Sequence, residues 1–159
     1  MAEDRIWTPE RLVLLVEAKT FEELHRIAED ILPLHEQPLG MLCGPISTGG
    51  EGSIGANIAI FEKTIAQLLA EGRRLFNQVP FEEPMHRIMG ADDGYYRGPD
   101  QLLENFYLPI FESGVIKYFW FLPTWESSYG ARWERRNAER LEIPYETLTA
   151  EWYERVKKA

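Results

Sequence analysis

The stretch Val115–Glu134, VIKYFWFLPTWESSYGARWE, decides how this chain folds. Its first part, before the proline, is rich in aromatic and β-branched side chains, which predicts a buried β-strand over residues 115–122. Pro123 ends the strand, and Ser127 or Ser128 can cap the helix that follows. The stretch therefore predicts a strand that leads directly into a helix.

Glu134 is the unusual residue of this predicted helix. It shares one helix face with Ala131 and Ala138, whose small side chains suit packing against a sheet. Burying a carboxylate without a partner is costly or raises its pKa. Glu134 is therefore either paired, with Arg132, Arg135 or a residue of the sheet, or it is a functional carboxylate.

Predicted strands and helices alternate along the rest of the chain. Strands are expected at residues 39–43, 73–77, 115–122 and 143–146, and helices at residues 53–71, 100–113 and 149–158. This alternation predicts an α/β fold, a three-layer flavodoxin- or Rossmann-like parallel sheet with strand order 2-1-3-4 and helices on both faces.

Two amphipathic segments precede the predicted α/β portion, and one long loop is expected within it. The two amphipathic segments predict a helical extension over residues 1–36, and we expect residues 37–159 to form the α/β portion of a single compact domain. Residues 85–99 are expected to be an irregular loop, in which Asp92 and Asp93 are typical turn residues.

A glycine-rich loop at residues 44–53 follows the first predicted strand. Its glycines let the backbone approach a ligand, and the following helix adds the positive end of its dipole. The loop matches neither a Walker loop nor the GxGxxG dinucleotide pattern. With strand order 2-1-3-4, this loop and residues 123–128 converge on one crevice, with Glu134 on its wall. Asn57, on the inward side of the helix, is expected to tie the loop down by hydrogen bonds.

Composition restricts the partners of the chain. A net charge of −9 disfavours long nucleic acid and anionic membranes. No apolar run approaches the roughly 20 residues of a membrane helix, and the polar residues 1–9 predict no secretory signal. Cys43 is the single cysteine, which predicts a reducing, cytoplasmic setting. No His/Cys cluster has the spacing of metal ligands, so we expect no metal and no other cofactor.

Several short segments together resemble one enzyme superfamily. They are Cys43-Gly44-Pro45-Ile46-Ser47, Asn57, Phe76-Asn77 and Trp-Glu-Ser-Ser-x-Gly-Ala-x-x-Glu at residues 125–134. These motifs resemble the nucleoside 2-deoxyribosyltransferase-like superfamily, which includes the deoxynucleoside monophosphate N-glycosidases, and the resemblance covers residues 39–146. In that family the glutamate of the last segment is the nucleophile that attacks the anomeric carbon and expels the base, which implies that Glu134 is catalytic here.

The resemblance also implies a substrate and its binding residues. It implies cleavage or transfer of the N-glycosidic bond of a nucleotide or nucleoside. Ser128 occupies the position at which the nucleotide-cleaving branch has serine, which suits a phosphate, and Trp125 or Tyr129 would stack on the base. Members are commonly dimers that complete each other's sites, so a homodimer or higher homo-oligomer is expected. The expected substrate-binding residues are Gly44, Pro45, Ile46, Ser47, Asn57, Trp125, Ser127, Ser128 and Gly130.

Three departures from the family pattern keep other functions open. Met41 stands where the family often has a tyrosine that orients the nucleophile. Pro45 replaces a serine that helps to hold phosphate, and has no amide hydrogen, while Ser47 replaces an arginine. The alternatives are a non-catalytic nucleotide-binding or sensing module of the same fold, and a structural α/β domain in which Glu134 is merely paired.

Overall fold

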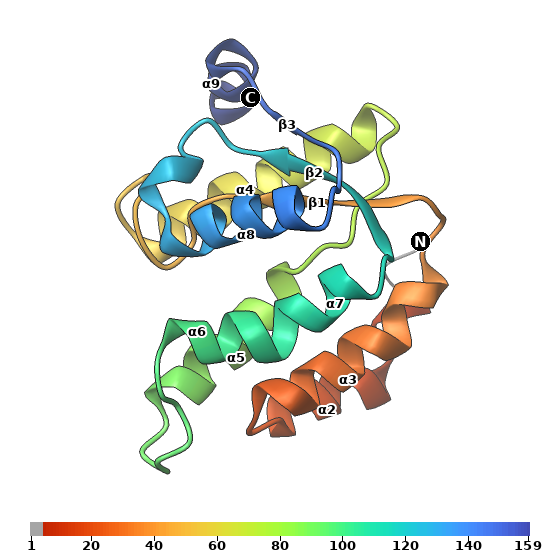
Figure 1. Cartoon of the computed structure of the whole chain (residues 1–159), viewed down its shortest axis with the longest axis vertical. Coiled ribbons are helices and arrows are strands. Elements are labelled where there is room, and N and C mark those ends of the chain that lie inside the picture. The colour runs from red at the N-terminus through yellow and green to blue at the C-terminus, as the bar shows by residue number, and fades with distance from the viewer. Residues whose placement is uncertain (1–4) are drawn as a thin grey trace. The chain divides into compact units, whose positions relative to one another are not determined.

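The computed structural model describes residues 5–159, which fall into two compact units (Figure 1). The first unit contains the described residues up to Glu36 together with Pro80–Ser113, and the second contains Gln37–Val79 and Gly114–Ala159. Residues 80–113 therefore group with the N-terminal helices rather than with the strands of the α/β portion.

The second unit is built on a small parallel sheet of three strands. In spatial order these are β1 (Leu39–Cys43), β2 (Ile116–Phe121) and β3 (Tyr145–Thr147). The last residues of the three strands are in register, because Cys43 pairs with Phe121 and Phe121 pairs with Thr147. The predicted α/β class, the parallel pairing and the adjacency of the first and third predicted strands are confirmed.

The prediction of a strand over residues 73–77 was wrong in its length. Only a single parallel bridge joins Leu75 to Gly40, in which the Gly40 N–H donates to the Arg74 carbonyl (2.8 Å) and the Phe76 N–H donates to the Gly40 carbonyl (2.9 Å). The segment then turns away, because the Asn77 side-chain oxygen accepts a hydrogen bond from the Val79 N–H (3.0 Å). Turn chemistry thus ends the pairing before a second bridge forms.

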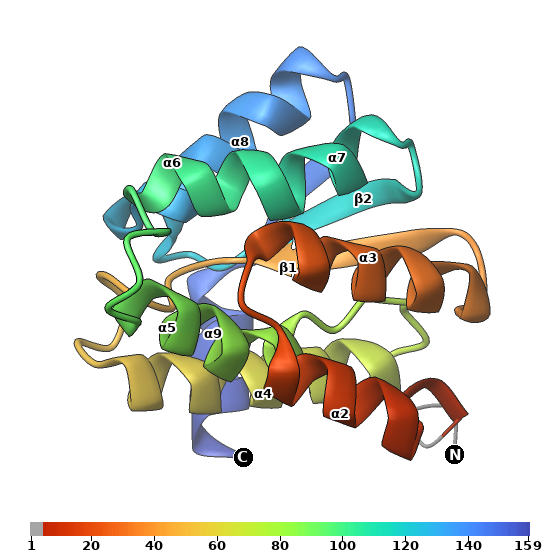
Figure 2. The ribbon, with the colours of Figure 1, turned by 90° about the horizontal axis from the view of Figure 1, so that it is seen from below.

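Helices cover both faces of the sheet, as Figures 1 and 2 show. Helices α4 (Ile54–Ala70) and α9 (Ala150–Lys158) lie on the face that carries Leu42, Trp120 and Leu122, and together they form the apolar core of this unit. Helix α8 (Tyr129–Arg140) lies on the face that carries Cys43 and Phe121. The alternation of side chains along β1 and β2 separates the two sets.

Each helix of the second unit begins at the hydroxyl side chain that the sequence places there. Ser53 Oγ accepts from the Ala56 N–H in α4, Ser128 Oγ accepts from the Ala131 N–H in α8, and Thr149 Oγ1 accepts from the Trp152 N–H in α9. These caps confirm the predicted starts of all three helices.

The first unit is helical. The Thr8 side chain caps the helix that begins at Pro9, and the Thr20 side chain caps the helix that begins at Phe21. Residues 85–90 belong to a helix, so the predicted irregular loop is shortened to residues 91–98. Its described elements are α2 (Pro9–Glu17), α3 (Phe21–Ile31), η1 (Leu32–Leu34), α5 (Glu82–Gly90), α6 (Pro99–Leu102), the π-helical turn η3 (Leu103–Tyr107) and α7 (Leu108–Glu112), and the short turn η2 (Val79–Phe81) leads into it. None of the helices in the described part of the chain has the length and apolar character needed to cross a membrane.

Candidate functional site

The glycine-rich loop after β1 is anchored by one buried side chain. Asn57, on α4, is 2% exposed. Its Oδ1 accepts a hydrogen bond from the Glu51 N–H (2.8 Å), and its Nδ2 donates to the carbonyls of Ile46 (2.9 Å) and Gly49 (3.1 Å). The predicted role of Asn57 in tying down the loop is confirmed, and its amide group is engaged with the protein itself.

The loop also contacts the turn that precedes α8. The Gly50 N–H donates to Ser127 Oγ (2.9 Å), and that hydroxyl donates in turn to the Thr124 carbonyl (2.7 Å). Gly49 has a φ of 69°, and a Cβ atom there would lie 2.3 Å from the Ser127 carbonyl oxygen. A residue with a side chain would therefore separate the two segments. The predicted convergence of residues 44–52 with residues 123–128 is confirmed.

Glu134 lies beside the end of β1. It is 7% exposed on α8, and its side chain is the hydrogen-bond partner of the buried Cys43 thiol. Burial, followed by the charge of Glu134 and this hydrogen bond, raises the pKa of Cys43 well above its usual value. The thiol is therefore protonated at neutral pH and donates to the carboxylate. A residue of the sheet, which was one of the partners weighed from the sequence, is therefore a partner of Glu134.

Arg135 makes a different kind of contact. Its guanidinium carbon lies 4.3, 3.9 and 4.4 Å from the ring centroids of Phe121, Trp125 and Tyr145, which is cation–π geometry. One of its terminal nitrogens donates to Thr147 Oγ1 (2.6 Å). The guanidinium occupies one side of the Trp125 ring, so a stacked base would have to use the other side.

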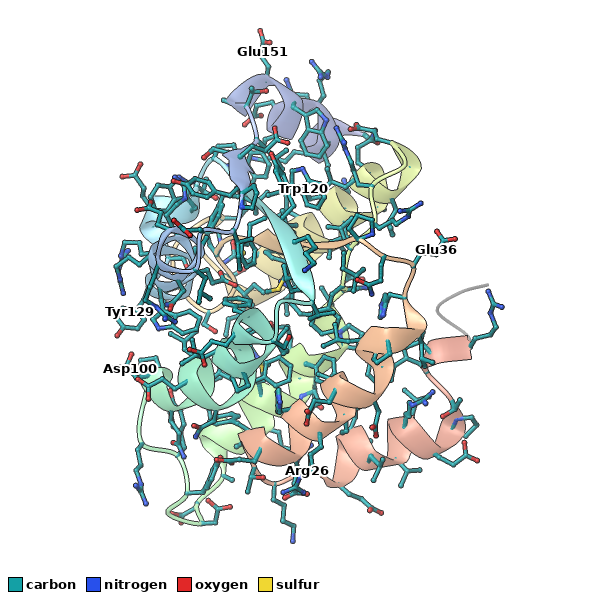
Figure 3. The ribbon with its side chains drawn as sticks, turned by 45° about the vertical axis from the view of Figure 1, so that its right-hand side comes forward. Arg26, Glu36, Asp100, Trp120, Tyr129 and Glu151 are labelled. Atoms are coloured by element: carbon teal, nitrogen blue, oxygen red, sulfur yellow. The ribbon has the colours of Figure 1, made fainter. Side chains whose placement is uncertain are left out.

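The remaining predicted site residues fall into two groups. Ser128 is 4% exposed, and its hydroxyl serves as the cap of α8. Tyr129 is 40% exposed at the outer surface of the first turn of α8, as Figure 3 shows, and Gly130 is half-buried in the same turn. In the loop, Pro45 is buried beside Gly50, and Ile46 packs on the core under α4, while Gly44 lies against Leu122 and Ser47 is exposed.

A cluster that the sequence did not indicate holds the far end of the loop. Glu51 forms a salt bridge with Lys157 (Oε1 to Nζ, 3.1 Å) and accepts a hydrogen bond from the Tyr153 hydroxyl at Oε2 (2.9 Å). The hydrogen bond from Lys157, and then that from Tyr153, lowers the pKa of Glu51. The partners are about a hundred residues apart in the chain, so no local pattern could have paired them.

Comparisons of the chain with protein-family models, with curated proteins and with solved structures give no match. Within residues 5–159, no group of three or more His, Cys, Asp or Glu side chains is arranged to hold a metal ion. The site is therefore defined by one buried carboxylate and two converging loops.

Proposed function

We propose that this protein cleaves or transfers the N-glycosidic bond of a nucleotide or nucleoside, with Glu134 as the nucleophile. The observation that carries the proposal is the position of Glu134. It is a buried carboxylate on α8, against the end of β1, close in sequence to the turn at which the glycine-rich loop meets residues 124–128. Structural cores rarely contain a carboxylate in such a position, whereas catalytic sites often do.

The chemistry follows the retaining route. A Glu134 carboxylate oxygen bonds to the anomeric carbon while the carbon–nitrogen bond breaks, and the base leaves with the electron pair and is protonated. Water, or the nitrogen of a second base, then attacks the anomeric carbon, which releases the carboxylate. The Cys43 thiol, donating to Glu134, would hold the carboxylate in one orientation for its attack on the anomeric carbon.

The fold proposed for this chemistry is a flavodoxin- or Rossmann-like three-layer sandwich. The parallel order β1-β2-β3, the bridge at Leu75 and the covering of both faces by helices support it. In such sheets ligands bind at the carboxyl ends of the strands, and both converging loops leave from those ends. A homodimer, in which each protomer completes the site of its partner, is part of this proposal.

A non-catalytic nucleotide-binding or sensing module is the second candidate, and specific contacts favour it. The Ser128 hydroxyl is used as the cap of α8, and the Gly50 and Glu51 amides are bonded to Ser127 and Asn57. Met41, at the position of the family's orienting tyrosine, is buried in the apolar core. These groups would have to exchange partners before they could serve a substrate.

Base release decides between the two functions. The protein is incubated with a panel of nucleosides and nucleoside monophosphates, and free base is separated by chromatography. The enzyme proposal expects release from at least one compound, with Glu134→Gln abolishing it and leaving nucleotide binding near its original strength. Glu62→Gln is the matched control, because Glu62 is an exposed acid of α4 outside both converging loops and should keep full activity.

Two results would contradict the enzyme proposal. Release that persists in Glu134→Gln would remove Glu134 from the chemistry. Absence of release from every compound, together with a rise in melting temperature caused by nucleoside monophosphates, would support the sensing module instead.

A further inference from the structure

A concave region lies where the strands begin, at the end of the sheet opposite the converging loops. It is a groove of about 590 Å³, lined by the first residues of β1, by the segment at residues 72–74 and by side chains of β2 and β3. We call it the edge groove. Its polar and aromatic side chains are Arg73, Arg74, Lys117, Tyr118, Trp120 and Glu146. The volume is that of a site for a small molecule.

The charge of the edge groove is opposite to that of the chain. Three cationic side chains, Arg73, Arg74 and Lys117, line it in a protein whose net charge is −9. Arg74 is held in place by donating to the Gln37 carbonyl (2.8 Å). The backbone N–H of Arg73 donates to the Leu68 carbonyl (3.0 Å), but the side chains of Arg73 and Lys117 make no hydrogen bond or salt bridge within the described part of the chain. They are therefore available to an anion.

The acidic side chains nearby are held by other groups. Glu146 Oε1 accepts hydrogen bonds from the Tyr118 hydroxyl (3.2 Å) and the Trp120 indole N–H (3.1 Å), and neither bond uses Oε2. Glu71 Oε2 accepts hydrogen bonds from Gln67 Nε2 (2.9 Å) and from Trp152 Nε1 (3.0 Å). The bond from Gln67 is the first cause of the lowered pKa of Glu71, and the electrostatic interaction with Arg73 comes after these bonds. Neither carboxylate therefore neutralises Arg73 and Lys117 as a direct partner.

The floor of the edge groove is aromatic and fixed. A Cβ atom at Gly40 would lie 2.2 Å from Trp120 Cζ3, so the indole ring rests directly on the strand backbone. Trp120, labelled on β2 in Figure 3, is 6% exposed and packs edge to face against Tyr118 at a centroid distance of 5.0 Å. This packing, with the two bonds to Glu146, fixes the carboxylate on one side of the groove.

We propose that the edge groove binds a small phosphate monoester that also carries hydroxyl groups. Arg73 and Lys117 would hold the phosphate, for which guanidinium and ammonium groups are the usual partners, and Glu146 Oε2 would accept from a hydroxyl. A long polyanion is disfavoured because the rest of this acidic chain repels it. The site goes beyond the proposed function, since it uses none of the residues around Glu134.

The probe is ribose 5-phosphate, with ribose as the comparison. Binding is followed by the ¹H–¹⁵N resonance of the Trp120 indole, assigned with Trp120→Phe. Saturable shifts of this resonance with ribose 5-phosphate, and a dissociation constant at least ten times higher for ribose, are expected. An unshifted Trp120 resonance, or equal affinity for both sugars, overturns the proposal.

Variants identify the residues responsible. Arg73→Gln/Lys117→Gln should weaken binding of ribose 5-phosphate at this resonance at least tenfold, whereas Arg73→Lys/Lys117→Arg should retain it within about threefold. Arg136→Gln/Lys158→Gln is the matched control, since it removes the same charge from exposed positions on α8 and α9, and should bind as the parent does. Equal weakening by this control would mean that net charge alone attracts the probe and would refute the site. Glu134→Gln should leave this binding unchanged, so the result is independent of whether the protein releases a base.

Discussion

Replacing Asn57 with alanine removes the three hydrogen bonds that anchor the glycine-rich loop. Each such bond contributes about 1 kcal/mol net, so the free energy of unfolding should fall by about 3 kcal/mol. Loop residues 47–53 are exposed, so water can replace part of the lost bonding, and the larger penalty for buried unsatisfied groups does not apply in full. The expected loss is therefore near this sum.

The assay combines urea unfolding with hydrogen exchange. The urea midpoint gives the change in stability, and the exchange rate of the Glu51 amide reports the bond to Asn57 Oδ1 directly. Asn57→Ala should make that amide exchange faster by at least tenfold. Asn137→Ala is the control, because Asn137 is also buried but its hydrogen bonds stay within α8, to the Trp133 carbonyl and Arg140. A loss below about 1 kcal/mol with unchanged Glu51 exchange would refute the anchoring argument.

Three further predictions concern stability. Burial raises the pKa of Glu82 from 4.5 to about 8, so the folded state keeps a proton that the unfolded chain releases, and stability should fall by up to about 5 kcal/mol between those pH values. Urea titrations across pH 4–9 should show this slope, and Glu82→Gln should remove it. Gly40→Ala should destabilise by about 1–3 kcal/mol, since the Trp120 ring must move, whereas Gly55→Ala meets no atom and should be neutral or stabilising in thermal melts. Arg135→Met should lower the urea-derived stability by about 1–2 kcal/mol, because the ring contacts lose their charge; an unchanged value would contradict the cation–π assignment.

Local chemistry explains what the sequence could predict. Ser53, Ser128 and Thr149 each cap the helix that begins after them, since a cap depends on atoms only three residues apart. The apolar runs at β1 and β2 predict buried strands because this pattern also lies within a few consecutive residues. Even the convergence of the two loops follows from local elements, because adjacent parallel strands bring their carboxyl ends to one edge.

Contacts between distant residues explain what the sequence could not predict. The segment 73–77 has the apolar pattern of a strand, but the Asn77 turn ends its pairing after one bridge. Residues 80–113 group with the N-terminal helices through packing that no window of sequence contains. Arg135 was weighed only as an ion-pair partner of Glu134, whereas its three aromatic neighbours come from two strands and a turn.

The attachment of the glycine-rich loop to α9 gives the molecule an internal optical probe. Glu51 is held by Tyr153 and Lys157, and the neighbouring Trp152 donates from its indole to Glu71 Oε2 (3.0 Å). A movement of the loop that pulls on Glu51 would shift α9 and alter the surroundings of the Trp152 indole. Because the chain has five tryptophans, the difference in emission between the parent and Trp152→Phe would then record, without any added label, when a molecule enters beside the loop.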